Sequence, residues 1–137
     1  MVVSGVGASV ETVPAYGQIA AVTQIDDAIE RGDMNVEDVV REYFADIPVM
    51  IQVARCESTF RHWRKDGSVL TGRVDSADTG VMQINKRYHE AAAQQMGLDV
   101  DQIEDNLAYA RHLYEEQGVQ PWSASQPCWG QTLAANL

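Results

Sequence analysis

Apolar residues recur at the three- and four-residue spacing of an amphipathic helix through most of the chain. The first predicted helix covers residues 18–31, where Ile25 and Ile29 share one face. A second helix begins after Asn35, whose side chain is a good N-cap, and ends near Ala45. The chain is therefore predicted to be mainly helical after an irregular start.

A third predicted helix begins at Asp46 as its N-cap and tolerates Pro48 in its first turn. Its apolar stripe, with helical spacing, consists of Ile47, Met50, Ile51 and Ala54. Glu57 lies on the last turn of this helix, at the edge of the stripe. This position places an acidic side chain half inside the core, where burial disfavours the charged form and raises the pKa.

Helical spacing returns in the second half of the chain. Residues 86–96 form one predicted helix, which Gly97 ends. Asp99 caps the next helix, which reaches Gln117 before a further glycine. The tail over 119–137 contains two tryptophans and a cysteine, so we expect it to pack back on the body of the protein.

The helical pattern is interrupted over residues 59–80. Short β-forming residues within this segment predict a small, irregular β-hairpin: Val69, Leu70, Thr71 and Val74. A non-helical insertion of this length in a small helical protein is usually either functional or disordered. The predicted fold class is therefore α+β, mainly α-helical.

Composition and charge narrow the function. A chain of 137 residues with 45% apolar residues supports one domain-sized core, and no apolar run is long enough to span a membrane. The formal charge of −10 argues against a nucleic-acid binder that tracks phosphates. Residues 55–89 carry seven basic and four acidic residues, so the middle of the chain is basic between acidic flanks. It either meets an anionic ligand or forms a solvated loop of mixed charge.

The two cysteines, Cys56 and Cys128, lie far apart in the sequence and form no zinc motif. They are either two inert thiols or one disulfide, and a disulfide would indicate an oxidising compartment. Residues 1–17 have neither the charged start nor the apolar centre of a signal peptide. The export signal was removed, the protein leaves the cell by another route, or the thiols stay reduced.

Most standard catalytic motifs are missing from the sequence. It has no phosphate-binding glycine loop, no GxSxG and no HExxH. The histidines are too scattered for a metal triad, and we expect surface or structural roles for His62, His89 and His112. We expect neither a metal nor a cofactor. Glu57 is then the best candidate for a general acid, because a buried carboxyl stays protonated near neutral pH. The alternative is a solvated acid at a helix end.

Two motifs in order resemble a known family. They are Glu57-Ser58-Thr59-Phe60 and Gly80-Val81-Met82-Gln83-Ile84-Asn85. Together they resemble the lytic transglycosylases of the soluble bacterial type, within the lysozyme-like superfamily. The segment Asn106–Ala110 resembles the next helix of that family, and the resemblance covers about residues 47–130. It implies a lysozyme-like catalytic domain over 46–137, and it leaves residues 1–45, an N-terminal tail with helices, unassigned.

A second resemblance concerns the cysteines. The Cys-Glu-Ser triplet and the Trp-x-x-x-x-Pro-Cys segment near the end are similar to the resuscitation-promoting factors, which are secreted wall-cleaving relatives. This similarity implies a bridge between Cys56 and Cys128 and a location outside the cytoplasm. The Ala-Tyr-Asn-x-Gly motif that is common in the transglycosylases is absent, and residues 121–125 stand in its place.

The resemblance also implies a mechanism. Glu57 would act as the single general acid and base that cleaves the β-1,4 bond between N-acetylmuramic acid and N-acetylglucosamine in peptidoglycan, leaving 1,6-anhydromuramic ends. The implied substrate-binding residues are Ser58, Met82, Gln83, Asn85, Tyr109 and Trp122. Ser58 would bond the acetamide or the acid, Tyr109 would orient the acetamido group, and Trp122 would stack on a sugar. The expected partner of this monomer is a peptidoglycan glycan strand.

Other interpretations of the same residues stay open. A second carboxylate, from Asp66, Asp75 or Asp78, would make the protein a hydrolytic muramidase, although such residues more often form turns. Met82 and Tyr109 suit the core as well as a cleft. A non-catalytic module that binds the cell wall is the alternative of another class.

Overall fold

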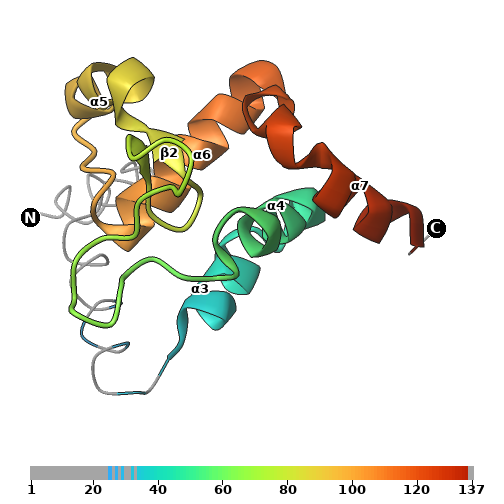
Figure 1. The fold of residues 1–137 in the computed structure, drawn as a ribbon, viewed down its shortest axis with the longest axis horizontal. Helices are drawn as coiled ribbons and strands as arrows, with labels where there is room; N and C mark the ends of the chain where they lie inside the picture. Colours follow the sequence, from blue (N-terminus) through green and yellow to red (C-terminus); the bar gives the residue numbers. More distant parts are fainter. Residues whose placement is uncertain (1–24, 26, 28, 30–31, 33, 136–137) are drawn as a thin grey trace, which may run out of the picture.

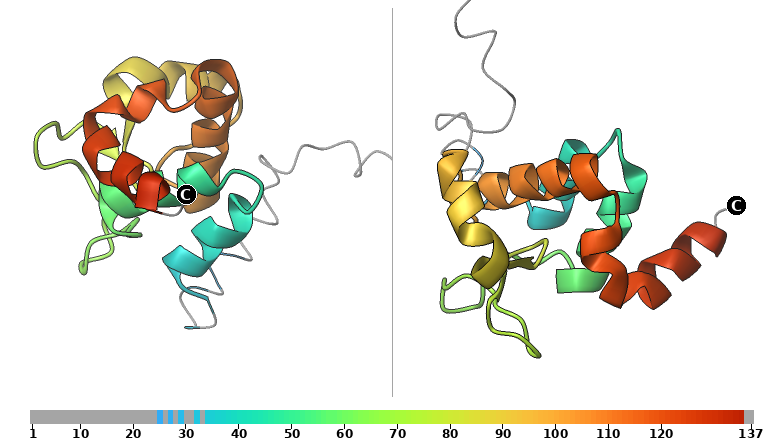
Figure 2. Two further views of the ribbon diagram at one scale, coloured as in Figure 1. Left: turned by 90° about the vertical axis from the view of Figure 1, so that its right-hand side faces the viewer. Right: turned by 90° about the horizontal axis from the view of Figure 1, so that it is seen from above.

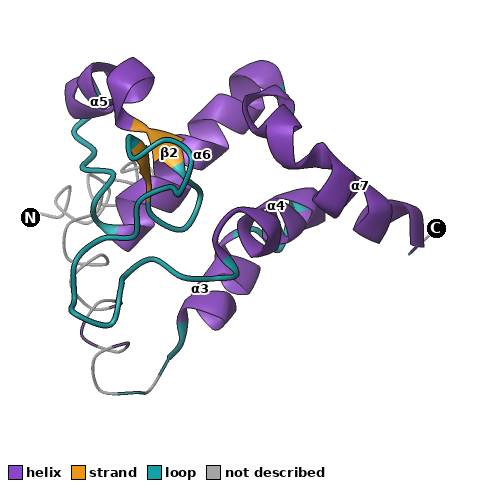
Figure 3. Ribbon diagram, in the orientation of Figure 1, coloured by secondary structure: helices purple, strands orange, loops and turns teal. Residues whose placement is uncertain are grey.

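The computed structural model describes residues 25, 27, 29, 32 and 34–135 (Figure 1). The described helices are α3 (Val36–Tyr43), α4 (Pro48–Ser58), α5 (Lys86–Gln95), α6 (Ile103–Gln117), the 3-10 helix η1 (Gln120–Ser125) and α7 (Gln126–Ala135). Two short strands, β1 (Asp78–Thr79) and β2 (Ile84–Asn85), pair antiparallel. Figure 3 shows this small sheet among the helices, and the mainly helical α+β class is confirmed.

The amino-terminal helices agree with the predicted ones only in part. Ile25, Asp27 and Ile29 are helical, and the other residues of the first predicted helix lie outside the described ones. The Asn35 side chain accepts a hydrogen bond from the backbone of Asp38 at 2.9 Å, which confirms the N-cap of α3. The helix ends at Tyr43, two residues before the predicted end.

The predicted N-cap at Asp46 is wrong. Helix α4 begins at Pro48 with Ile47 as its N-cap, and no side chain caps it. The Asp46 carboxylate instead accepts two hydrogen bonds of 2.9 Å from the Arg111 guanidinium of α6. A two-point contact with a guanidinium is stronger than a cap bond, so a residue far along the chain takes this carboxylate away from the helix end.

Helix α6 runs through the core, and all residues from Ile103 to Ala110 are buried. Its first turn starts later than predicted: Gln102, not Asp99, is the N-cap, and Asp99 accepts a bond from the backbone of Asp101 in the preceding turn. Helix α3 joins the same apolar core through Val39 and Val40, so α3, α4 and α6 share one interior.

A buried amide joins α6 to the segment that carries the second motif. Asn106 Nδ2 donates to the carbonyl oxygens of Thr79 and Val100, and its Oδ1 accepts from the backbone of Met82, each at 2.9 Å. Gly80 lies directly beside this amide with a positive φ of 74°. A Cβ atom at Gly80 would come within 2.6 Å of both Asn106 and His62, so only glycine fits there.

His62 is fully buried and has a structural role. Its Nδ1 accepts a hydrogen bond from the backbone of Val81 at 3.0 Å, and its Nε2 donates to the carbonyl oxygen of Asp101 at 2.7 Å. This pattern requires the neutral ring, and burial accordingly lowers the pKa of His62. The ring thereby fixes the position of the 80–82 backbone.

The insertion after α4 is mostly loop. Isolated bridges join Trp63 to Val69 and Thr71 to Thr79, but the paired strands lie later, at β1 and β2. The predicted hairpin is therefore wrong in its position: of its β-forming residues, Val69 and Thr71 form isolated bridges, and the Val74 side chain is fully exposed. β-Propensity depends on a neighbour to pack against, and the Val74 side chain is open to solvent. Both views in Figure 2 show this loop projecting from the helical body.

The carboxy-terminal tail forms two helices that the sequence analysis did not predict. Pro121 and Pro127 each lie in the first turn of a helix, η1 or α7, where a proline is tolerated. Trp122 and Trp129 are buried, which confirms that the tail packs back on the body. The described helices include none with the length and apolar character needed to cross a membrane.

A disulfide joins Cys56 of α4 to Cys128 of α7, as the resemblance implied. The two cysteines are 72 residues apart, so the bridge removes much of the freedom of the unfolded chain. We predict that changing both cysteines to serine lowers the free energy of unfolding by about 4 kcal/mol. Urea denaturation of the variant beside the oxidised parent measures this. The chain has no other cysteine, so a loss below about 1 kcal/mol would contradict the chain-entropy argument.

Candidate functional site

A groove of about 970 Å³ runs between the end of α4 and the insertion. Its lining includes Glu57 on the last turn of α4, the loop over 70–75, and Ser125 at the end of η1. A second hollow of about 290 Å³ shares Asp78 and Gln83 with the groove and extends toward α5 and η1. Because they share these two residues, the two hollows adjoin each other.

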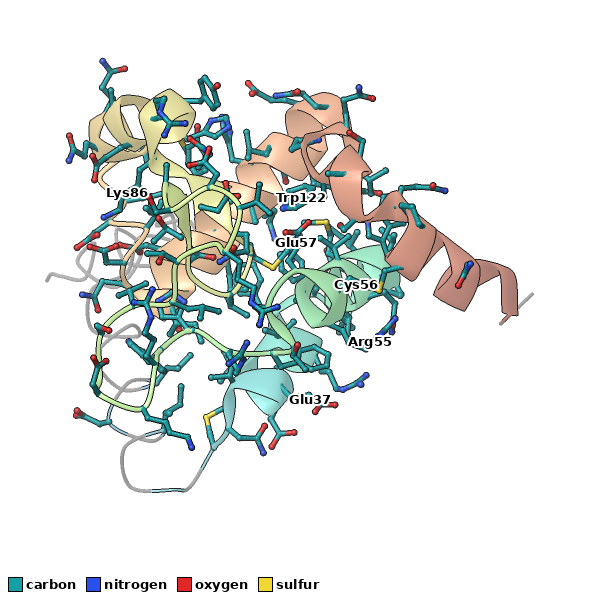
Figure 4. The ribbon with its side chains drawn as sticks, viewed as in Figure 1. Glu37, Arg55, Cys56, Glu57, Lys86 and Trp122 are labelled. Atoms are coloured by element: carbon teal, nitrogen blue, oxygen red, sulfur yellow. A yellow bond between two sulfur atoms is a disulfide. The ribbon has the colours of Figure 1, made fainter. Side chains whose placement is uncertain are left out.

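Glu57 lies on the last turn of α4 and is half-buried. Figure 4 shows it on the side of the helix that faces Trp122, with Arg55 on the other side. Burial raises the pKa of the Glu57 carboxyl, the hydrogen bond from Ser125 lowers it, and the negative charge of Asp78 raises it. The net effect is a raised pKa, as predicted from the position at the edge of the apolar stripe.

The backbone just after Glu57 is strained. Thr59 and Phe60 both have positive φ, 56° and 57°, although neither is glycine. Residues with side chains rarely adopt this conformation, and two in succession cost free energy that the surrounding contacts must supply. The turn ends α4 abruptly, so that Glu57 and Ser58 stand at the edge of the groove where the insertion begins.

Ser125 holds the Glu57 carboxylate. Its hydroxyl donates to Glu57 Oε2 at 2.7 Å, and the indole of Trp129 donates to the Ser125 oxygen at 3.1 Å. Sequence reasoning missed Ser125 as a site residue. Its only signal was its place in residues 121–125, which stand where the related family has another motif. The disulfide between Cys56 and Cys128 ties α4 to α7, and Cys56 lies one residue before Glu57.

Two of the three candidate aspartates line the groove. Asn85 donates to both of them, at 3.0 Å to Asp75 and 3.0 Å to Asp78. Asp75 also pairs with Arg87 at 2.9 Å, and the hydrogen bonds from Arg87 keep the pKa of Asp75 well below its ordinary value. Asp66 instead accepts bonds from Ser68 in an exposed turn outside the groove. Asp78 is thus the carboxylate best placed to influence Glu57.

Three predicted substrate-binding residues lie along the groove or the adjoining hollow. Gln83 lines both hollows, with a positive φ of 52° and its side-chain amide donating to the Gly80 carbonyl oxygen. Asn85 lines the smaller hollow and also caps α5 by accepting from the backbone of Arg87. Ser58 lines the groove, but its hydroxyl donates to the Ala54 carbonyl oxygen. Strained backbone at Gln83 marks this part of the groove as a functional candidate.

The other three predicted residues lie deeper. The Met82 side chain is in the core, and its backbone carbonyl oxygen accepts a hydrogen bond from the Trp122 indole at 2.9 Å. Trp122 borders the smaller hollow but is 3% exposed, so its face is covered by protein rather than open for a sugar. Tyr109 is buried outside both hollows, and its hydroxyl bonds His89 at 3.0 Å. These three side chains are therefore buried in the protein interior and do not form an open sugar-binding surface.

No group of three or more metal-ligating side chains occurs within the part of the chain that the structure describes. Comparisons of the chain with protein-family models, curated proteins and solved structures gave no match. The chemical character of the site thus rests on a half-buried carboxyl with a raised pKa in the lining of the groove.

Proposed function

We propose that this protein cleaves the β-1,4 bond between N-acetylmuramic acid and N-acetylglucosamine in peptidoglycan without adding water, and leaves 1,6-anhydromuramic ends. The lysozyme-like resemblance of the two motifs suggests the substrate. The observation that carries the proposal is the Glu57 carboxyl, which has a raised pKa and is held by Ser125 beside the groove. A general acid works best with a pKa close to the working pH, and burial shifts the pKa of Glu57 upward, in that direction.

In the proposed reaction, protonated Glu57 donates its proton to the glycosidic oxygen as the bond from C1 of the muramic sugar breaks. The acetamido carbonyl of that sugar stabilises the positive charge that develops at C1. The Glu57 carboxylate then takes the proton of the 6-hydroxyl, whose oxygen attacks C1 and closes the anhydro ring. Glu57 ends protonated, as it began. Ser125 binds Oε2, which leaves Oε1 for the proton transfers.

The product tests the proposal directly. Purified cell wall would be digested in water enriched in heavy oxygen, and the muropeptides analysed by mass spectrometry. We expect anhydro ends that are one water lighter than hydrolytic ends and carry no heavy oxygen. Reducing ends that contain heavy oxygen would overturn the transglycosylase reaction.

The second candidate function is a hydrolytic muramidase, which the position of Asp78 favours. Most glycosidases use two carboxylates, and Asp78 lines the groove and acts electrostatically on Glu57. In that reaction Asp78 would activate the attacking water. Two results together would establish this alternative. The products of the parent would contain heavy oxygen, and the Asp78→Asn variant would lose the activity that forms them.

Two substitutions should move the pH profile in opposite directions. The acid must be protonated, so kcat/KM falls as the pH rises through the pKa of Glu57. Ser125→Ala removes a bond that lowers this pKa, so we expect the alkaline limb to move to higher pH. Asp78→Asn removes a charge that raises it, so the limb should move to lower pH. Ser123→Ala, an exposed change in the same segment, is the control. Shifts in the same direction would contradict the assignment.

We further propose that the protein acts outside the cytoplasm as a monomer on glycan strands. The disulfide between Cys56 and Cys128 supports this location, because structural disulfides persist in oxidising compartments. Fractionation of cells that produce the protein, with the thiols blocked at lysis, tests both the location and the redox state.

A further inference from the structure

Three arginines of the insertion line the groove that holds Glu57: Arg61, Arg64 and Arg73. They are part of the basic stretch over 55–89 in a chain whose formal charge is −10. Positive charge is thus concentrated on the wall of the groove in a protein that is otherwise acidic. General attraction to an anionic cell wall does not explain this placement, because the remaining surface would oppose it.

The arginines are held near the site but their charges are not neutralised there. Arg61 donates from Nε to the Ser58 carbonyl oxygen at 3.1 Å, which fixes it one residue from Glu57 and leaves both Nη groups for a ligand. Arg64 donates to the Val69 carbonyl oxygen and the Thr71 hydroxyl, so it stiffens the loop. Arg73 is exposed. None of the three forms an ion pair with another residue that the structure describes.

The acids of the groove do not balance this charge. Asp75 is already paired with Arg87 outside the groove lining, so Asp78 and Glu57 together offset at most two of the three arginine charges. Glu57 has a raised pKa because it is half-buried. The wall formed by the three arginines therefore faces the groove with a net positive charge. Neutral amino sugars do not require a positively charged surface, whereas a carboxylate can accept two parallel hydrogen bonds from a guanidinium.

We propose that Arg61, Arg64 and Arg73 form a subsite for the carboxylates of the stem peptides attached to muramic acid. This inference rests on the proposed function, and it adds a preference for glycan strands that carry peptides over strands from which an amidase has removed them. Arg61 is bonded next to the reacting carboxyl, so the subsite adjoins the muramic sugar that would be cleaved. The lactyl group that bears the peptide belongs to that sugar.

The test compares two substrates of equal length, peptide-bearing strands and amidase-treated strands. We expect kcat/KM for the parent to be about tenfold higher on the peptide-bearing strands, as charged hydrogen bonds to carboxylates would give. Arg61→Gln combined with Arg73→Gln should remove most of this ratio, mainly through KM. Arg64 stays unchanged because it supports the loop. Arg41→Gln, an exposed arginine paired with Glu37 on α3, is the matched control and should keep the ratio.

A third substrate separates carboxylates from other peptide groups. Strands whose stem carboxylates have been amidated should behave like amidase-treated strands. The inference is overturned if the parent cleaves all three substrates equally, or if the double variant loses the same factor on each. The inference would also be overturned if a phosphate polymer inhibited cleavage of the peptide-bearing strands at concentrations that leave cleavage of the amidated strands unchanged. That result would favour phosphate binding. Absence of anhydro products from every substrate would instead refute the proposed function.

Discussion

Replacing Glu57 with glutamine should reduce the cleavage of peptidoglycan by about 1,000-fold or more, because one group would both donate and accept the proton. Glutamine has nearly the same size and still accepts the hydrogen bond from Ser125 at its carbonyl oxygen. It cannot deliver a proton to the glycosidic oxygen. Clearing of wall suspensions and mass spectrometry of the soluble muropeptides would measure the loss.

The same variant should not be less stable than the parent. The folded-state pKa of Glu57 is raised, so the folded protein favours the protonated carboxyl, and ionisation of this group lowers stability as the pH rises through the unfolded-state value. Glutamine removes that cost, and at neutral pH the melting temperature should equal or exceed that of the parent. This outcome separates lost chemistry from lost folding.

A matched control is Glu115→Gln, an exposed change on α6 that should keep full activity. If Glu57→Gln clears the wall as well as the parent does, Glu57 is not the acid. The protein would then be a wall-binding module that has the groove without the reaction.

Local patterns predicted the parts of the fold that depend on neighbours in sequence. The cap at Asn35 and the ends of helices near Gly97 and Gly118 follow from backbone groups that nearby residues can satisfy. The cap at Asp46 failed because its partner, Arg111, lies 65 residues away. Long-range pairs of this kind leave no periodic signal in the chain.

In the site, too, features set by nearby residues were predicted and those set by long-range contacts were not. The position of Glu57 at the edge of an apolar stripe was enough to predict its raised pKa. Its partner Ser125 was missed, because only the packing of Trp129 and the bridge to α4 bring it there. The resemblance implied that Met82 and Gln83 both bind substrate, and the core stayed open as the alternative for Met82. Gln83 reaches the groove while Met82 enters the core.

Changing Asn106 to alanine should lower the free energy of unfolding by about 3–5 kcal/mol. The substitution leaves three buried backbone groups, at Thr79, Met82 and Val100, without the partner they have now. Each unsatisfied buried group costs about 1–3 kcal/mol, and the higher helix propensity of alanine offsets only about 0.5 kcal/mol. Urea denaturation with a single probe would measure the difference.

Asn35→Ala is the natural comparison, because it also removes an asparagine side chain that bonds the backbone. Its single bond is exposed, so the expected loss is about 1 kcal/mol. A loss for Asn106→Ala no larger than this would show that water replaces the amide. If the loss is larger, we also expect the activity of the variant to fall by more than its unfolded fraction explains. The reason is that the Asn106 amide holds the turn before Gln83 against α6. The buried amide then contributes to the reaction by fixing the wall of the groove.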